Sequence, residues 1–192
     1  MLIGRNVFGS IKCLAVIAAL ALAGAFVPSL ALASSTSELE RQSSAALQSL
    51  YASNPQARAL GAKSHAILIF PKVTKAGFMV GGQTGDGVLR VDGKIHGYYN
   101  ISAASFGMQA GAQTFSYVMF FVNKSALDYL EKSQGWQIGS GPSVVILDQG
   151  MARSLNTTNL TQDVYTMVFG QKGLMGGVGL EGSKITPIKS KD

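Results

Sequence analysis

The stretch GGQTGDGVLRVDGKIHGYY, residues 81–99, decides the fold. Residues 88–91 form a short aliphatic run, and the pair Asp92-Gly93 that follows is typical of a two-residue hairpin turn. A second strand is therefore expected from Lys94 to Tyr99. Four glycines lie in the seven residues before Val88, and glycine is kept inside a strand where a sheet bends sharply or backbones approach closely. The stretch predicts two antiparallel strands of a strongly bent sheet.

Short apolar runs separated by turn residues recur along the rest of the chain. The first, residues 66–70, is closed by Pro71, which predicts that the strand ends there. Further strands are expected at residues 78–80, 107–122, 143–147, 164–169, 174–180 and 185–188. Glycine clusters lie within several of these runs, so the same bent geometry is expected throughout the sheet.

Helical patterns lie before and between the strands. One helix is predicted from Ser37 to about Ala52. A second is capped by Asn54 and ended by Gly61, and a third covers residues 126–132. The order favours an α+β fold in which N-terminal amphipathic helices pack on a curved, mostly antiparallel, glycine-rich sheet, either barrel-like or a sandwich.

The first 33 residues differ from the remainder. Arg5 and Lys12 precede an almost unbroken apolar run, and the small residues Ala31 and Ala33 have the spacing of a signal-peptidase site. We expect a signal peptide over residues 1–33 and a single domain over residues 34–192. A retained membrane anchor is the alternative, since the run approaches the ~20 apolar residues that span a bilayer.

The composition of the expected domain excludes some classes of site. The one cysteine, Cys13, falls in the leader, so thiolate metal ligands and cysteine nucleophiles are excluded. Of the 16 Lys and Arg residues, two lie in the leader, which leaves 14 against 10 Asp and Glu. This mild positive charge suits an anionic membrane surface, and export argues against nucleic acid as a partner.

No motif in the sequence indicates catalysis, a metal or a cofactor. His65 and His96 stand 31 residues apart with no cluster of carboxylates beside them, which is not the spacing of a metal site. Residues 177–182 fit Gly-x-Gly-x-x-Gly, but the chain ends too soon after them for a dinucleotide-binding unit. We therefore expect a non-catalytic protein, although a deep pocket that joined His96 to an acid would favour an enzyme.

Basic residues offer the most suggestive chemistry. Lys72 and Lys75 are expected on a turn at residues 71–77, where they would meet a phosphate, and the alternative is a solvated turn without function. Lys63, Arg58, Arg90 and Lys94 join them if the fold brings these residues together. Apolar side chains crowd one long predicted strand, and an exposed subset would complete an amphipathic patch. They are Phe106, Phe115, Tyr117, Met119, Phe120 and Phe121.

Residues 57–188 resemble the SYLF domain family, the lipid-binding or actin-binding domain of eukaryotic endocytic adaptors, and in particular its secreted bacterial members. The resemblance rests on spaced motifs at residues 66–71, 75–77, 81–82, 85–89, 107–111, 141–142, 165 and 173–182. It implies binding of anionic phospholipids without catalysis. It also implies headgroup contacts by basic residues near the start of the domain, which here are Lys72 and Lys75, with Lys63 as a further contact.

Two functions follow as hypotheses. The first is an exported module, periplasmic or secreted and peripheral on a membrane, that recognises anionic phospholipid through the basic turn and adjacent apolar surface. The alternative is an envelope structural or protein-interaction domain without lipid specificity. Binding to vesicles distinguishes them, because the second function needs a protein partner and no lipid.

Overall fold

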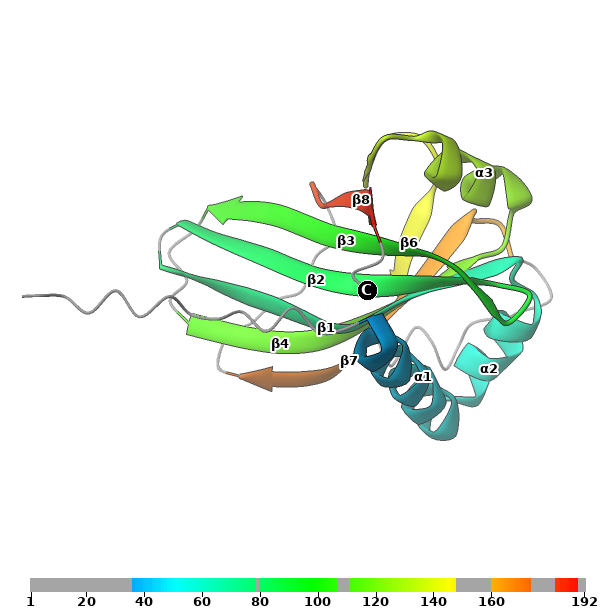
Figure 1. Ribbon diagram of the computed structural model, residues 1–192, viewed down its shortest axis with the longest axis horizontal. Helices are drawn as coiled ribbons and strands as arrows, with labels where there is room; N and C mark the ends of the chain where they lie inside the picture. Colours follow the sequence, from blue (N-terminus) through cyan, green and yellow to red (C-terminus); the bar gives the residue numbers. More distant parts are fainter. Residues whose placement is uncertain (1–35, 79, 107–110, 148–159, 174–181, 190–192) are drawn as a thin grey trace, which may run out of the picture. The chain divides into compact units, whose positions relative to one another are not determined.

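The computed structural model describes residues 36–78, 80–106, 111–147, 160–173 and 182–189. The predicted leader, the strand expected at 174–180 and most of the glycine motif at 177–182 lie outside these residues. The described elements are three helices and eight strands (Figure 1). They are α1 (Thr36–Ser53), α2 (Pro55–Ala62), β1 (Ala66–Phe78), β2 (Val80–Val91), β3 (Lys94–Phe106), β4 (Gly111–Phe121), α3 (Lys124–Lys132), β5 (Trp136–Gln137), β6 (Val144–Leu147), β7 (Val164–Gly173) and β8 (Lys184–Ile188).

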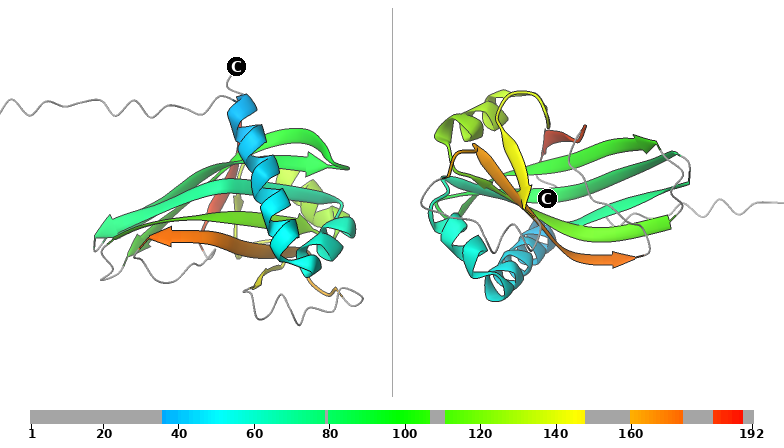
Figure 2. Two further views of the ribbon diagram at one scale, coloured as in Figure 1. Left: turned by 90° about the horizontal axis from the view of Figure 1, so that it is seen from below. Right: turned by 180° about the vertical axis from the view of Figure 1, so that it is seen from behind.

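The strands form a single curled sheet in the order β5-β8-β3-β2-β1-β4-β7-β6 (Figure 2). All described pairs are antiparallel except β6 with β7, which are parallel. The prediction of an α+β fold with a curved, mostly antiparallel sheet is confirmed. A sheet curled on itself realises the barrel-like form of that prediction, since no second sheet packs against it among the described residues.

The hairpin between β2 and β3 forms at the predicted turn. Asp92 has φ 49° and Gly93 has φ 77°, the left-handed pair that a type I′ turn requires. An added Cβ at Gly93 would meet no atom within 4 Å, so backbone conformation explains this glycine. The strand predicted at 78–80 is divided between two elements, since Phe78 ends β1 and Val80 begins β2. From Val80 the strand β2 continues without a break into the strand predicted at 88–91, because the glycine-rich segment between them also pairs with β3.

Pro71 lies inside β1 and does not end the strand as predicted. The pairing of β1 with both β2 and β4 shifts register around this residue. Proline has no N–H for the ladder and is tolerated in a strand at a bulge. The hydroxyl of Ser116 on β4 donates to the Pro71 carbonyl over 2.7 Å, which fixes the bulge. The predicted turn at residues 71–77 is therefore part of a central strand.

Two apolar clusters lie on the two faces of the sheet. The face that α3 covers, called the α3 face below, carries a cluster with residues from both ends of the strand order, so the sheet curls around it. The helices α1 and α2 lie against the other face, the α1–α2 face (Figure 2), and form a second cluster with it. The α3-face cluster includes Leu68, Phe70, Leu89, Ile101, Tyr117, Met119, Phe121, Leu127, Leu130, Trp136, Val164 and Ile185. The α1–α2 cluster includes Leu47, Leu50, Ala57, Leu60, Ile69, Val118, Phe120, Leu147, Tyr165 and Met167.

The helix α2 begins where the sequence indicated and ends for a different reason. The side chain of Asn54 accepts a hydrogen bond from the Ala57 N–H over 3.0 Å, which confirms the predicted N-cap. Gly61 lies within the helix, and its added Cβ would fall 2.0 Å from the Tyr51 hydroxyl oxygen. Glycine is therefore present to make room for Tyr51 and not to stop the helix. In the part of the chain that is described, neither this helix nor the others combine the length and apolarity of a membrane span.

Candidate functional site

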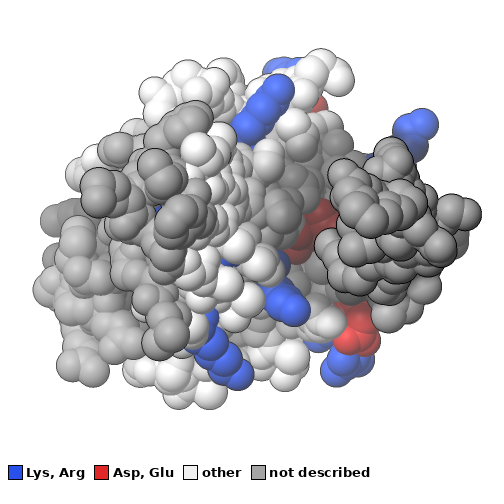
Figure 3. Space-filling view, turned by 90° about the vertical axis from the view of Figure 1, so that its left-hand side faces the viewer, with Lys and Arg blue, Asp and Glu red and all other residues white. Residues whose placement is uncertain are grey.

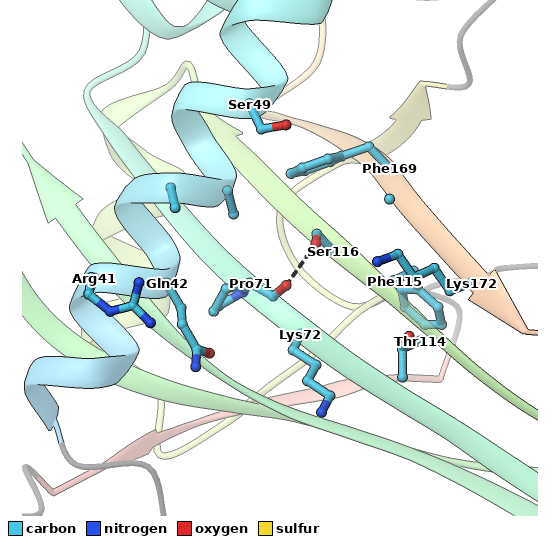
Figure 4. A pocket seen from close by; sticks show the side chains of 13 residues that line it. Arg41, Gln42, Ser49, Pro71, Lys72, Thr114, Phe115, Ser116, Phe169 and Lys172 are labelled. Carbon is cyan, nitrogen blue, oxygen red and sulfur yellow. Dashed lines mark hydrogen bonds between the residues drawn. The ribbon is translucent and has the colours of Figure 1, made fainter.

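A groove of about 580 Å³ lies between α1 and the strands β1, β4 and β7 (Figure 4). We call it the α1 groove. The helix presents one stripe of residues to it, since positions 41, 45 and 49 are spaced by four residues and lie on one side of a helix. The groove is lined by Arg41, Gln42, Ala45, Ala46, Ser49, Pro71, Lys72, Thr114, Phe115, Ser116, Phe169, Gly170 and Lys172.

Three cationic side chains from three elements line this groove. Arg41 comes from α1, Lys72 from the bulge of β1 and Lys172 from β7 (Figure 4). Neither lysine forms a hydrogen bond or ion pair with another residue of the described ranges. None of the described lining residues is acidic. Both lysines are exposed, so their amines are available to an anion.

Arg41 already holds one carboxylate. Its guanidinium donates two hydrogen bonds to Glu38, of 2.8 Å and 2.6 Å, and Gln42 donates a third over 2.7 Å. The hydrogen bond from Arg41, followed by that from Gln42, lowers the pKa of Glu38 to about 2. Glu38 is therefore ionised at neutral pH and offsets the charge of Arg41, which leaves Lys72 and Lys172 as the uncompensated cations of the groove.

The remaining lining is partly polar and partly apolar. Hydroxyl groups line the groove at Ser49, Thr114 and Ser116. The hydroxyl of Ser116 already donates to the Pro71 carbonyl. Ala45, Ala46 and Pro71 add small apolar surface, and Phe169 lies partly buried against the α1–α2 cluster. Such a mixture is typical of sites that orient a charged group beside an apolar one.

A second pocket, called the α2 pocket below, has a volume of about 420 Å³. It lies where the end of α1, α2, the start of β1 and the β2–β3 hairpin meet. It shares no lining residue with the α1 groove. The α2 pocket is lined by Leu47, Tyr51, Arg58, Gly61, Ala62, Ser64, His65, Ala66, Ile67, Arg90, Asp92 and Gly93.

Arg58 and Arg90 are the predicted cations that the structure brings together. Both line the α2 pocket, and Lys63 and Lys94 are sequence neighbours of residues that line it without lining it themselves. The other two predicted cations are separated. Lys72 lines the α1 groove, whereas Lys75 lies outside both pockets.

The separation of Lys72 from Lys75 corrects the expected convergence at Pro71. Lys72 lines the α1 groove, whereas the next residue, Val73, belongs to the cluster of the α3 face. Lys75 is aligned with Gln83 on β2 and Gln113 on β4, both of them buried side chains. It shares the α3 face with Val73, two residues away, which belongs to that face's cluster. Lys75 therefore cannot join Lys72 around one ligand.

The aromatic strand does not supply an exposed apolar patch. Phe115, Tyr117, Met119, Phe120 and Phe121 are all buried, and the side chain of Phe106 lies outside the described set. The exposed large apolar residues of the described ranges are Val80, Ile95 and Tyr129, which belong to three different elements. On the face shown in Figure 3 the visible Lys and Arg side chains likewise lie at separate positions, one of them beside an acidic side chain.

The histidines do not form a catalytic or metal site in the described part of the chain. His96 Nε2 lies 3.0 Å from Glu131 Oε1, but their side chains are 54% and 34% exposed, so the pair lies on the surface and not in a deep pocket. His65 lines the α2 pocket. No group of three or more residues able to hold a metal occurs among the described positions.

Comparison with known proteins gives a family. Residues 102–192 match the model of the Ysc84 family, which is described as a Las17-binding protein and actin regulator. The matched segment includes Lys172 of the groove, while Arg41 and Lys72 precede it. No curated protein matches the chain. The match includes the glycine motifs at residues 107–111 and 173–182, and it shows that residues 102–192 are similar to the Ysc84 (SYLF) domain.

Proposed function

We propose that this protein binds the headgroups of anionic phospholipids in the α1 groove. The proposal rests on one observation: cationic side chains from α1, β1 and β7 line the same groove. None of the described residues that line it is acidic. The family whose model matches residues 102–192 is described as Las17-binding, which agrees with a role in binding. The ligand and its location at a membrane are our inference from the groove.

The physical basis is electrostatic, with an apolar contribution. Each Lys or Arg near an anionic membrane surface contributes about 1 kcal/mol of binding free energy. Lys72 and Lys172 together thus supply about 2 kcal/mol, and Arg41 adds less because Glu38 occupies it. Phe169 and the alanines of α1 give the glycerol region of a lipid an apolar wall. Because this attraction is screened, binding is expected to weaken as salt is added.

Co-sedimentation with phosphatidylglycerol vesicles at low ionic strength tests the proposal. Each of the substitutions Lys72→Gln and Lys172→Gln is expected to weaken vesicle binding about fivefold, and the double variant more strongly. Lys189→Gln is the matched control, since it removes one positive charge from an exposed position outside the groove. Vesicles of phosphatidylcholine, which carry no net charge, are expected to leave the protein in the supernatant.

Equal losses in the groove variants and in Lys189→Gln would show that overall charge, not the groove, attracts the membrane. Absence of binding to phosphatidylglycerol at low salt would contradict the proposal outright. Circular dichroism of each variant separates these outcomes from unfolding.

A protein-interaction role without lipid specificity is the second candidate, and the description of the family as Las17-binding favours it. In this case the protein is expected to leave vesicles unbound and to form a complex with a protein partner. Affinity capture of one stoichiometric partner, unaffected by Lys72→Gln and Lys172→Gln, would support this function over lipid binding.

We propose in addition that the protein is exported, with residues 1–33 as a cleaved leader. The basis is the order of two cations, an apolar run and the Ala31–Ala33 pair in the sequence. Intact-mass measurement of the protein purified from its host tests this. A mass equal to that of residues 34–192 is expected, and a mass that retains the leader would favour the anchor instead.

A further inference from the structure

The α2 pocket has features of a second anion site that does not depend on the α1 groove. Its volume of about 420 Å³ falls in the range of sites that enclose small ligands. Arg58 and Arg90 both line it, and Asp92 is the one acidic residue among the described lining residues. Asp92 forms no ion pair with either arginine in the described structure, so their charges are not neutralised by it.

Arg90 is held in place and keeps donors for a ligand. Its Nη2 donates to the hydroxyl of Ser44 on α1 over 2.6 Å. A guanidinium has five N–H donors, and the Nε of Arg90 is buried without a hydrogen-bond partner among the described residues. A charged donor that is buried and unpaired is unfavourable. An anion with several oxygens, seated against this guanidinium, would relieve that deficiency.

Arg58 enters from α2 and packs on an aromatic wall. Its guanidinium carbon lies 5.7 Å from the centre of the Tyr51 ring, a contact that stabilises a cation over an aromatic face. The Tyr51 hydroxyl occupies the space that a side chain at Gly61 would need. Burial raises the pKa of Tyr51, so its hydroxyl keeps its proton at neutral pH and remains a donor.

We propose that the α2 pocket binds a phosphomonoester group, with Arg58 and Arg90 as its two cationic contacts. The planar guanidinium matches the spacing of phosphate oxygens and forms paired hydrogen bonds with them. A phosphomonoester carries close to two negative charges at neutral pH, which balances two arginines. His65 and Ser64 are further lining residues with groups able to contact the phosphate or its ester oxygen.

Calorimetric titration with glycerol 3-phosphate tests the proposal for a soluble ligand. Arg58→Gln is expected to weaken binding about tenfold, because hydrogen bonds to charged groups are the stronger kind. Arg58→Lys retains the positive charge but cannot form the paired hydrogen bonds of a guanidinium, so it is also expected to weaken binding. The matched control is Lys94→Gln, which removes one charge beside the pocket from a residue that does not line it and should change affinity less than about twofold.

The same variants with vesicles that contain phosphatidic acid distinguish the two sources of a phosphomonoester. Binding of glycerol 3-phosphate that depends on Arg58 supports the pocket as a site for soluble esters. Loss of phosphatidic acid binding in Arg58→Gln, with glycerol 3-phosphate unbound by the wild type, supports it as a site for a lipid headgroup. Lys72→Gln is expected to leave the affinity for glycerol 3-phosphate unchanged, because Lys72 does not line the α2 pocket, while it weakens binding to anionic vesicles through the α1 groove. A failure of the groove and a failure of the pocket therefore give different results.

Arg90→Lys provides an independent variant, because it preserves a cation beside Ser44 while it removes Nε. Its affinity is expected to fall as in Arg58→Lys. The proposal is overturned if neither probe binds, if both arginine variants bind like the wild type, or if Lys94→Gln loses as much affinity as Arg58→Gln. Circular dichroism confirms that each variant is folded before its affinity is interpreted.

Discussion

The two faces of the sheet are built differently. On the α3 face a continuous cluster contains most of the largest fully buried side chains, including Trp136, Tyr117 and Phe70. On the α1–α2 face the apolar cluster lies beneath two helices, and both the α1 groove and the α2 pocket open beside α1. The comparison indicates that the α3 face supplies stability while the α1–α2 face leaves room for ligands.

Polar contacts account for part of this difference. The helix α1 is tied to the sheet by the hydrogen bond from Arg90 to Ser44 and by one of 2.5 Å from the Tyr98 hydroxyl to Glu40. On the α3 face, the indole N–H of the fully buried Trp136 donates to the Ser140 carbonyl over 2.8 Å. These hydrogen bonds hold α1 on the sheet without filling the space on either side of the helix, where the α1 groove and the α2 pocket lie.

The largest predicted effect is at Trp136 on the α3 face. Its side chain is fully buried and lies near the rings of Phe121 and Tyr129. Trp136→Ala is expected to lower the free energy of unfolding by about 3–5 kcal/mol, because a large cavity replaces the indole. Urea denaturation measures this change. A loss below about 1 kcal/mol would mean that the α3 face does not carry the main core.

The next largest effect on stability is expected at Gly87, and it compares a tightly packed glycine of β2 with an exposed one. An added Cβ at Gly87 would lie 2.5 Å from the Phe70 ring and 2.7 Å from the Ile69 carbonyl oxygen. Gly87→Ala is therefore expected to lower stability by about 1–3 kcal/mol through overpacking. Gly82→Ala is the matched control on the same strand, since its nearest contact would be at 3.4 Å. Equal losses measured by urea denaturation would indicate a general glycine effect and not the contact with Phe70.

Local sequence features predicted the parts of this fold that local physics determines. The pair Asp92-Gly93 forms a turn because its own backbone adopts the left-handed conformation. The Asn54 side chain caps α2 by accepting a hydrogen bond from the N–H of Ala57, three residues later. In a turn or a helix cap, the residues that interact are neighbours in the sequence. Short sequence patterns are therefore sufficient to identify both features.

The candidate binding surface was less predictable than the turn and the helix cap, because it is formed by segments that are distant in the sequence. Pro71 indicated a strand end, and only the bulge formed with both neighbouring strands shows why β1 continues through it. The strand geometry then places Lys75 on the opposite face from Lys72. Arg41 and Lys172 were missed as site residues, since no local pattern joins α1 to β7.

A smaller effect is expected at the start of α2, on the face for which ligand binding is proposed. Asn54→Ala removes the N-cap and is expected to lower stability by about 1 kcal/mol. Asn54→Asp retains an acceptor for the Ala57 N–H and is expected to restore most of the loss, as urea denaturation should show. Because Arg58 is carried by this helix, glycerol 3-phosphate binding should fall in Asn54→Ala and recover in Asn54→Asp. Failure of the aspartate to rescue would show that the hydrogen bond is not the source of the effect.

The smallest effect concerns a polar junction beside the α3 face. The Asp163 carboxylate accepts hydrogen bonds from Asn123 Nδ2 at 2.6 Å, and from the Ser143 N–H and hydroxyl at 2.8 Å and 2.7 Å. The hydrogen bond from Asn123, followed by those from Ser143, lowers the pKa of Asp163. A carboxylate whose pKa is lower in the folded state stabilises the protein above its unfolded pKa, near about 3.9. That stability is lost as pH falls from there through the folded pKa.

Asp163→Asn tests this junction, because the amide keeps the shape of the side chain without its charge. The wild type should exceed the variant in free energy of unfolding by about 0.5 kcal/mol at pH 7, a small amount since the carboxylate is partly in solvent. Urea denaturation from pH 7 downward should show this difference shrinking below about pH 4. A difference that stayed constant with pH would assign the loss to altered hydrogen-bond geometry. Vesicle binding at neutral pH should be equal in the two proteins, because Asp163 lines neither the α1 groove nor the α2 pocket.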